Sequence, residues 1–248
     1  MPAPTSTESL DLPGVPLHGF RGHEPVASLI RPRGLTVAIS RQAGARGTSI
    51  ARKVAEILAW QVFDHDTLDY LAQDDTAREQ LLVDVPADAR QWADAQLARL
   101  QHERGLNIDA NTLKLVRLVL LVAARGNAVI VGRAAGFLLP HETTIHVRIV
   151  APLDSRIAYM AQWMRLTHPE AAEEVRARDE QRARFLDRTL VFDPADLTAY
   201  DVVVNSDRLG VEGAAQFIGW AVRTKQMFVE IAQSPTPPAL DSLDQLAS

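Results

Sequence analysis

The sequence of 248 residues contains no cysteine, so disulfide bonds and thiolate zinc sites are excluded. It has no basic excess: 26 Lys and Arg stand against 31 Asp and Glu, and the net charge of −5 gives no support to nucleic-acid binding. The strongly apolar run at 118–124 is too short to cross a bilayer, and the N-terminus lacks the features of a secretory signal. We therefore expect a cytoplasmic protein that binds neither nucleic acid nor membrane.

Lysine is also scarce, because Lys53, Lys114 and Lys225 are the only three in the chain. Almost every basic residue is therefore an arginine. An arginine at any one position is less surprising here than in an average protein, and this background applies to each arginine discussed below.

The length is sufficient for one α/β domain with a sizeable core. Residues 1–33 contain six prolines and follow no helical or strand period, which predicts a flexible N-terminal extension. Residues 234–248 begin Ser-Pro-Thr-Pro-Pro and are predicted to be a flexible C-terminal tail. The folded domain is expected to span residues 34–233.

Strand and helix patterns alternate through this domain. Strands are predicted at 35–40, 61–63, 128–131, 143–150 and 201–205, and helices at 48–59, 66–73, 87–102, 111–124, 152–166, 169–185 and 211–232. The alternation implies an α/β fold with a parallel sheet, whose ligands bind beyond the carboxyl ends of the strands. The amphipathic helices at 87–102 and 111–124 are expected to contribute to the core, and they offer a possible homodimer surface.

A short β-branched strand runs directly into a glycine-containing loop that opens a helix, which is the arrangement of a phosphate cradle. Phosphate loops usually follow G-x-x-x-x-G-K-[ST], or G-x-x-G-x-G-K-G-T in nucleotide kinases. Ser40 stands where the first glycine belongs and Arg46 where the lysine belongs. The predicted phosphate-binding residues are Gln42, Ala43, Gly44, Ala45, Arg46, Gly47 and Thr48. Arg46 is either a cation that bridges phosphates or a surface arginine at a helix start.

Polar residues follow the predicted strands where each one ends. They are Arg41, Asp64, Arg133, Asn205 and Ser206. Arg41 is either a second cation or part of a structural ion pair. Asp64 either acts through Mg²⁺ and the acceptor or caps the next helix, a task that suits Asp66 better. An arginine directly after a buried strand is hard to explain by packing, so Arg133 is predicted to bind phosphate.

Arg178 and Arg182 lie four residues apart and share one face of the predicted helix at 169–185. One interpretation is a lid that closes over a transferring phosphate. The other is a solvated face on which acidic neighbours pair with the arginines. The histidines show no metal-ligand spacing.

Six segments together resemble the cytidylate kinase-like family of P-loop nucleoside monophosphate kinases. They are AISRQ (38–42) with the following loop, VFD (62–64), VIVGR (129–133), APLDSRI (151–157), DVVVNS (201–206) and LGVEG (209–213). The resemblance covers residues 35–225, and its specificity comes from the order and spacing of the pieces.

The resemblance implies a three-layer α/β/α fold with a five-stranded parallel sheet and a helical lid. It also implies ATP and Mg²⁺ as cofactors, with a small phosphorylated acceptor opposite the nucleotide. Residues 42–48 would hold the donor phosphates, and Asp64 would face the acceptor or a magnesium-bound water. Arg133 would hold the acceptor phosphate, and Arg178 and Arg182 would be the lid arginines. Asn205 and Ser206 would lie near the donor base.

Two positions depart from the family pattern: the loop lysine is missing, and Val131 stands where cytidylate kinases carry an aspartate that recognises the acceptor. The sequence therefore leaves the acceptor open. The leading hypothesis is a phosphotransferase that moves the γ-phosphoryl group of ATP to a nucleoside monophosphate or similar small acceptor. The alternative is a nucleotide-binding regulatory or assembly protein with little or no turnover.

Overall fold

The structure is a computed structural model that describes residue 32 and residues 34–103, 108–190 and 192–233. The predicted N-terminal extension, apart from residue 32, and the predicted C-terminal tail lie outside the described residues. The domain boundaries at 34 and 233 therefore stay predictions.

Five strands form one parallel sheet in the order β2-β3-β1-β4-β5. The strands are β1 (Thr36–Arg41), β2 (Gln61–Phe63), β3 (Ala128–Val131), β4 (Thr144–Val150) and β5 (Val202–Asn205). The helices are α1 (Gly47–Leu58), α2 (His65–Gln73), α3 (Asp75–Val83), α4 (Ala87–Glu103), α5 (Ala110–Arg125), α6 (Ala135–Leu138), α7 (Leu153–Met164), α8 (His168–Leu190) and α9 (Ser206–Gln233), with a 3₁₀ turn at Leu197–Ala199. The predicted α/β fold with a five-stranded parallel sheet is confirmed.

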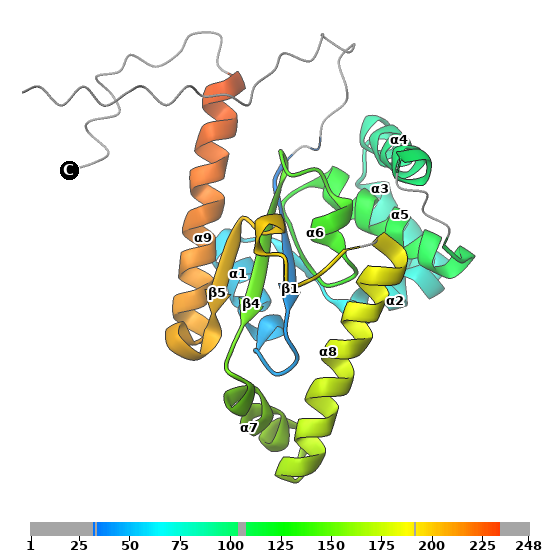
Figure 1. Ribbon diagram of the computed structural model, residues 1–248. Helices are drawn as coiled ribbons and strands as arrows, with labels where there is room; N and C mark the ends of the chain where they lie inside the picture. Colours follow the sequence, from blue (N-terminus) through cyan, green and yellow to red (C-terminus); the bar gives the residue numbers. More distant parts are fainter. Residues whose placement is uncertain (1–31, 33, 104–107, 191, 234–248) are drawn as a thin grey trace, which may run out of the picture.

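Helices cover both faces of the sheet, and the strands are apolar for that reason (Figure 1). Val37 and Ile39 of β1 pack on the side of α1 and α9. Ala38, between them, packs on the side that α2, α4, α5 and α6 cover. Because side chains alternate along a strand, a single apolar run supplies both layers of core.

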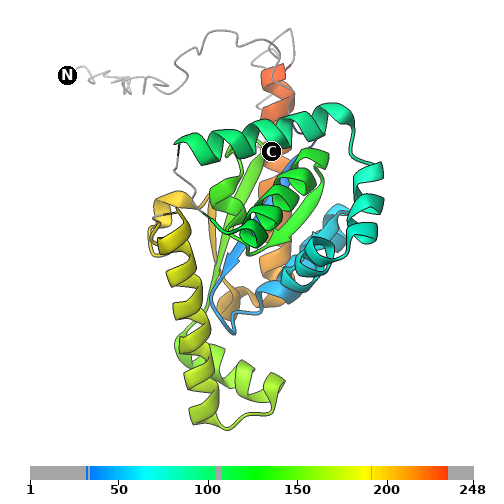
Figure 2. The same ribbon diagram turned by 90° about the vertical axis from the view of Figure 1, so that its right-hand side faces the viewer.

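Helices α7 and α8 form a hairpin that projects beyond the carboxyl edge of the sheet (Figures 1 and 2). It has its own small core, in which Ile157 and Met160 of α7 pack against Ala171 and Val175 of α8. Ala43 of the loop after β1 joins that cluster, so the hairpin rests on the predicted phosphate cradle. The hairpin occupies the place predicted for the helical lid.

The structure differs from the sequence prediction at α3, α6, α8 and α9. Helix α8 runs to Leu190, whereas its predicted end was 185. Helix α3 was not predicted. None of its residues is fully buried, and only Ala77, Leu81 and Leu82 pack against the core, so its apolar pattern is weak. Helix α6 is a single turn. Helix α9 begins at Ser206 rather than at 211, because a first turn precedes Gly210, whose backbone is non-helical with φ 66°.

Helices α4 and α5 contact each other and contribute side chains such as Trp92, Leu100 and Leu120 to the core, so their predicted core role is confirmed. Their use as a homodimer surface stays a prediction. Within the described ranges, no helix combines the length and the apolar character needed to span a bilayer.

Candidate functional site

The loop between β1 and α1 leaves the start of α1 open to an anion. Helices α2, α3 and α5 begin with an aspartate whose carboxylate accepts hydrogen bonds from the first turn. Helix α1 has no such cap, since its N-cap residue is Arg46 and its first turn holds no acidic residue. The free N–H groups and the positive end of the helix dipole therefore face the loop, as a phosphate cradle requires.

The loop is fixed to its surroundings through the backbone and the side chain of Gln42. The Gln42 N–H donates to the Ile149 carbonyl (3.0 Å), and the Gln42 Oε1 accepts from the Ala151 N–H (3.1 Å). Gly44 has φ +79°, and a Cβ there would lie 2.5 Å from the Arg156 carbonyl oxygen. Only glycine fits at residue 44, because the backbone is left-handed and Arg156 leaves no space.

A carboxylate from the hairpin already touches the loop. The Ala43 N–H donates to Asp179 Oδ1 (2.7 Å), and Arg156 Nη1 donates to Asp179 Oδ2 (2.5 Å) and to the Ala43 carbonyl (3.2 Å). Arg156 is buried, with 7% of its surface exposed. This bridge ties α7, α8 and the loop together, and the sequence analysis did not identify either of its two side chains as part of the site.

Arg46 occupies the lysine position, but its side chain turns toward the hairpin. Its backbone is left-handed (φ 56°), and its guanidinium carbon lies 4.9 Å from the centroid of the Tyr159 ring on α7. Arg46 is exposed to solvent. Gly47 and Thr48 follow it in the first turn of α1, as predicted.

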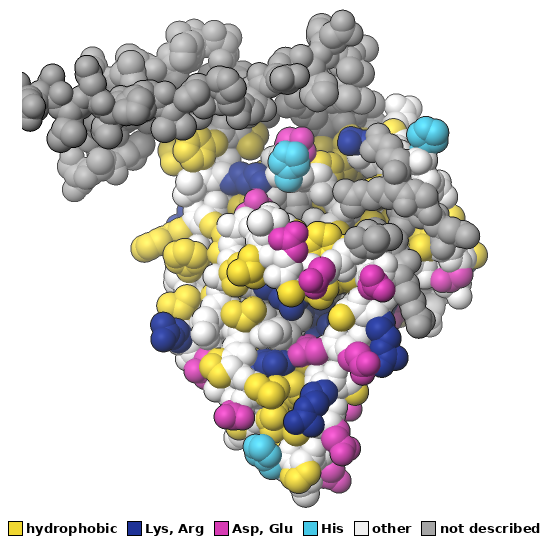
Figure 3. Space-filling view, viewed as in Figure 1, with side chains coloured by type: hydrophobic (Ala, Val, Ile, Leu, Met, Phe, Trp, Pro, Cys, Tyr) yellow, Lys and Arg dark blue, Asp and Glu magenta, His cyan; other side chains and the backbone are white. Residues whose placement is uncertain are grey.

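Four arginines gather at the carboxyl edge of the sheet, and we call them the arginine cluster: Arg41, Arg133, Arg148 and Arg182. Arg41 lies at the end of β1 and Arg133 lies two residues after β3. Arg148 belongs to β4 and Arg182 to α8. The pKa of Arg41 is lowered to about 10, mainly by burial and also by the nearby positive charges of the other three arginines. The negative charge of Asp64 partly offsets this lowering. Figure 3 shows arginine and lysine side chains between the sheet and α8. Packing cations together in this way is unfavourable unless an anion joins them.

Arg133 is oriented by two residues of α2. Its Nη2 donates to Asp69 and to His65 Nε2 (3.0 Å), while His65 Nδ1 lies 3.0 Å from Asp69 Oδ2. The Arg133 Nε is buried and has no hydrogen-bond partner among the described residues. A held guanidinium with a spare donor suits the predicted phosphate contact.

Asp64, and not Asp66, is the N-cap of α2. Its Oδ1 accepts from the Thr67 N–H (3.1 Å) and the Thr67 hydroxyl (2.8 Å), whereas the Asp66 side chain is fully exposed. The expectation that Asp66 forms the cap was wrong, because residue 64 is the last extended residue before the helix. Burial raises the pKa of Asp64, but the Thr67 hydrogen bonds and the Arg52 charge outweigh it, so the carboxyl pKa lies below its usual value.

The two predicted lid arginines differ in position. Arg182 Nη1 donates to the Arg41 carbonyl (3.4 Å) and lies 3.6 Å from Asp179. Burial lowers the pKa of Arg182, as do the charges of Arg178 and Arg148. Arg178 instead donates to Glu174 (2.5 Å) and contacts the Met164 sulfur. The structure therefore brings Arg182, but not Arg178, into the arginine cluster.

Asn205 and Ser206 serve the start of α9. The Asn205 Oδ1 accepts from the N–H groups of Asp207 (3.0 Å) and Arg208 (3.3 Å), and the buried Ser206 hydroxyl donates to the Val150 carbonyl (3.3 Å). These contacts order the end of β5 at the same edge of the sheet. Their predicted place near a donor base stays a prediction.

His146 and Arg148 of β4 were missed by the sequence analysis. They alternate with Ile145, Val147 and Ile149, which face the α1 and α9 layer. Two polar residues at alternating positions of a buried strand were the available signal, since such a strand is otherwise apolar on both sides. Arg148 lies with its guanidinium carbon 5.7 Å from the centroid of the Tyr200 ring.

His146 holds Ser40, the residue at the first glycine position of the phosphate-loop pattern. Its Nδ1 donates to the Ala199 carbonyl (2.9 Å), and because a carbonyl only accepts, Nε2 is left to accept from the Ser40 hydroxyl (2.9 Å). The ring is buried and packs against Phe137 and Tyr200. Burial lowers the pKa of His146 to about 4, against the opposing effects of Ala199 and Asp201.

Because the lowered pKa keeps His146 neutral in the folded protein, we expect the protein to lose stability in acid. The unfolded chain binds the proton below its ordinary pKa of 6.5, whereas the folded protein binds it only near about 4, so His146 stabilises the fold above pH 6.5 and ceases to do so as the pH falls toward 4. Between about pH 7 and about pH 4.5 the free energy of unfolding will fall by about 2 kcal/mol more in the wild type than in His146→Gln. Urea titrations at both pH values measure it, and equal losses in the two proteins would contradict it.

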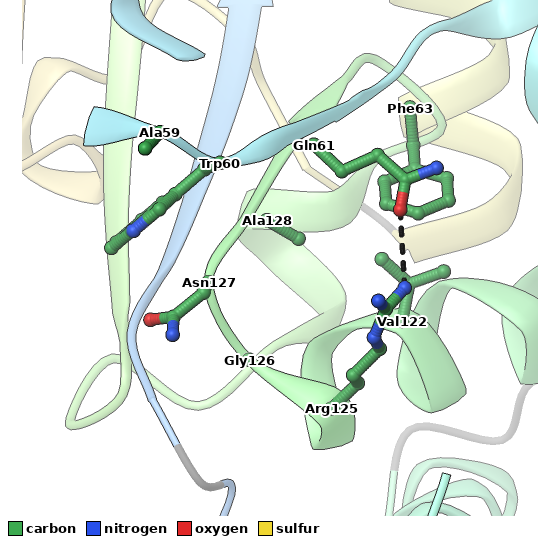
Figure 4. A pocket seen from close by; sticks show the side chains of 9 residues that line it. All are labelled: Ala59, Trp60, Gln61, Phe63, Val122, Arg125, Gly126, Asn127 and Ala128. Carbon is green, nitrogen blue, oxygen red and sulfur yellow. Dashed lines mark hydrogen bonds between the residues drawn. The ribbon is translucent and has the colours of Figure 1, made fainter. Parts of the chain in front are cut away.

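A cavity of about 290 Å³ lies at the opposite edge of the sheet, where β2 and β3 begin (Figure 4). Trp60, Gln61, Asn127 and Ala128 line it, and Arg125 donates to Gln61 Oε1 (3.1 Å) across it. Its distance from the strand ends separates it from the cradle and the arginine cluster.

Comparisons with known proteins identify similar sequences and a similar fold. A cytidylate kinase from Ignicoccus hospitalis is 32% identical over 106 residues, which are 43% of this chain and 62% of that protein. An uncharacterized protein from Eubacterium ventriosum superposes with a TM-score of 0.55 at 18% identity, covering 77% of this chain and 99% of the other, which indicates a shared fold.

The shikimate kinase from Bacteroides thetaiotaomicron superposes less closely, with a TM-score of 0.44 at 14% identity over 76% of this chain and 98% of that one. The sequence profile of the cytidylate kinase-like family matches residues 36–208, which include the cradle, all four cluster arginines and the hairpin. Since this match spans well over half of the 248 residues, the chain belongs to the cytidylate kinase-like family.

Proposed function

We propose that the protein transfers the γ-phosphoryl group of ATP to a nucleoside monophosphate or a similar small phosphorylated acceptor. The observation that carries the proposal is the arginine cluster beside an uncapped helix N-terminus. The arginine cluster can neutralise the negative charge of an acceptor phosphate and of the transferring group. The uncapped helix N-terminus can bind the donor phosphates. A protein that only binds a nucleotide needs the cradle alone.

Each part has a task in this reaction. The loop of residues 42–48 surrounds the donor phosphates, which accept hydrogen bonds from the N–H groups of Gly47 and Thr48 in the first turn of α1, and Arg133 holds the acceptor phosphate. Arg182, on the hairpin, neutralises charge over the transferring group. Asn205, Ser206 and Arg178 lie around the donor nucleotide. Such positioning and charge neutralisation supply most of the catalysis in phosphoryl transfer.

The transfer itself needs little covalent chemistry from the protein. An oxygen of the acceptor phosphate forms a bond to the γ-phosphorus as the bond from that phosphorus to the β–γ bridging oxygen breaks. The electron pair stays with ADP. A phosphate monoester is largely a dianion at neutral pH, its second pKa being about 6, so this acceptor needs no general base.

The residues present fit Mg²⁺, which needs only one or two protein oxygens beside the phosphates and water. The Thr48 hydroxyl in the first turn of α1 and the ionised Asp64 carboxylate would hold it. When bound, the ion offsets phosphate charge. Among the described residues, no group of three or more His, Asp or Glu side chains could hold a metal ion without such help from phosphates.

One contact favours the alternative function, a nucleotide-binding regulatory or assembly protein with little turnover. The Asp179 carboxylate accepts a hydrogen bond from the Ala43 N–H, where it competes with phosphate for the same donor. Together with the missing lysine, this contact would keep the cradle closed to phosphate unless the hairpin moves.

A thermal shift and a transfer screen test the proposal together. Saturating Mg-ATP will raise the melting temperature by about 5–10 °C, because ligand at about 100 times its Kd stabilises by about 2.7 kcal/mol. Adenosine with Mg²⁺ is the control, since it lacks the phosphates that the cradle binds. The same protein with labelled ATP and a panel of nucleoside monophosphates will yield ADP and a phosphorylated acceptor.

The outcomes separate the two functions. A thermal shift with no transfer to any acceptor would favour the regulatory alternative. If no nucleoside triphosphate shifts the melting temperature, both the phosphotransferase and the nucleotide-binding regulatory hypotheses are rejected. Equal shifts with adenosine and ATP would mean that binding does not use the cradle.

A further inference from the structure

Arg41 is held in a slot formed by two glycines. A Cβ on Gly47 would lie 2.7 Å from the Arg41 Cγ, and a Cβ on Gly132 would lie 2.2 Å from the Arg41 Nη1. Gly47 begins α1 and Gly132 directly follows β3, so the stem passes one glycine and the guanidinium rests against the other. Any larger residue at either place would displace this side chain. The position of the charge is therefore fixed before a ligand binds.

Within the described residues this fixed charge makes no direct pair with a carboxylate, although the more distant charge of Asp64 acts on it. The Arg41 guanidinium makes no hydrogen bond or ion pair there, although Arg133 is paired with Asp69 and Arg182 lies near Asp179. Arg148 contacts the Tyr200 ring but likewise no carboxylate of the described chain. Two arginines of the cluster thus lack a direct carboxylate partner among the described residues, and a phosphoryl group carries two negative charges.

Arg46, at the position of the missing lysine, does not share this arrangement. Its guanidinium lies over Tyr159 and its side chain is exposed. Arg41 lies at the other end of the same loop. The loop thus retains a cation, but at its first end instead of its last.

We propose that Arg41, with Arg148 beside it, supplies the charge that neutralises the transferring phosphoryl group, the task for which this chain has no loop lysine. Arg41 contacts the phosphoryl oxygens and Arg148 adds the second charge. The transfer step rests on the proposed function, whereas the binding of a phosphate dianion by Arg41 and Arg148 does not. This binding can be measured without turnover.

The test uses the full chain with four variants. Arg41→Met keeps the stem that fills the slot and removes the charge, while Arg41→Lys restores a charge. Arg46→Met removes the rival cation. Arg223→Met, an exposed arginine of α9, is the matched control for loss of one positive charge. The probes are Mg-ATP and inorganic pyrophosphate, followed by calorimetry, and the melting temperature is measured with and without them.

Arg41→Met will weaken binding of both probes by about 10–100-fold, the usual loss for a charge-assisted hydrogen bond. Arg46→Met will weaken it less, Arg41→Lys will recover part of it, and Arg223→Met will bind like the wild type. Without a probe, the melting temperature of Arg41→Met will be equal to or above that of the wild type, because the variant relieves repulsion within the cluster. A residue that only supports the fold would show the reverse.

The proposal is overturned if Arg41→Met binds both probes like the wild type, if Arg46→Met loses more affinity than Arg41→Met, or if Arg41→Met is less stable without a probe and Arg41→Lys recovers no binding. These results are distinct from a failure of the proposed function. If the wild type binds pyrophosphate through Arg41 but transfers no phosphoryl group, the proposed function is rejected and the anion site at Arg41 is supported. If the wild type transfers phosphoryl groups while Arg41→Met binds both probes normally, the proposed function is supported and the anion site at Arg41 is rejected.

Discussion

Replacing Arg133 by methionine will lower the kcat of phosphoryl transfer by about 10²–10³-fold, the usual loss when one preorganised donor to a transition state is removed. Arg133 is held by Asp69 and His65 and keeps a buried Nε without a partner in the described chain, so its donors are already aimed before a ligand arrives. The Kd for ATP will change little, because the donor phosphates bind to the loop on the other side of β1.

Arg117→Met is the control for this experiment. Arg117 is also an arginine paired with an aspartate, Asp94, but both side chains are 53% exposed and lie on α4 and α5. Initial rates with the acceptor found in the screen, and calorimetry with ATP, give kcat and Kd for both variants. If Arg133→Met lowers ATP affinity and kcat in equal proportion, it acts on the donor and not on the acceptor. If it unfolds the protein, its role is structural.

The sheet could be predicted from the sequence because its signal is strong and local. The strand 128–131 is wholly apolar, and the structure buries all four of its residues between two helix layers. Strand ends also predicted the edge at which polar residues gather, since all strands of a parallel sheet end on one side. The loop before α1 followed from the glycine pattern.

The contacts within the site could not be predicted in the same way, because they join residues far apart in the chain. Nothing local pairs Asp179 with the Ala43 N–H, which lies 136 residues away, or distinguishes Arg182 from Arg178 on the same helix. An acidic residue near an arginine on a helix suggests a solvated pair, and for Arg178 and Glu174 that interpretation agrees with the structure. Arg148 was missed because the apolar residues that alternate with it were sufficient to predict a strand, and the polar positions between them were not considered separately.

The second large effect concerns Gly136, which makes room for His146. Helix α6 crosses the His146 ring so closely that a Cβ on Gly136 would lie 2.0 Å from the ring carbon Cδ2. The ring cannot move without losing its hydrogen bonds to Ser40 and Ala199. Gly136→Ala will therefore lower the free energy of unfolding by about 3 kcal/mol, as overpacking in a core does at its upper range.

Gly213→Ala is the matched control, because it makes the same substitution inside helix α9. A Cβ there meets only the Leu209 Cβ at 3.5 Å, an ordinary contact, so the change will raise the free energy of unfolding by about 0.5–1 kcal/mol. Denaturant titration of both variants measures the two opposite signs. Gly136→Ala will also weaken ATP binding, since a displaced His146 no longer holds Ser40 at the start of the cradle. A Gly136→Ala protein as stable as the wild type would mean that α6 shifts freely, and that His146 does not position the loop through a rigid contact.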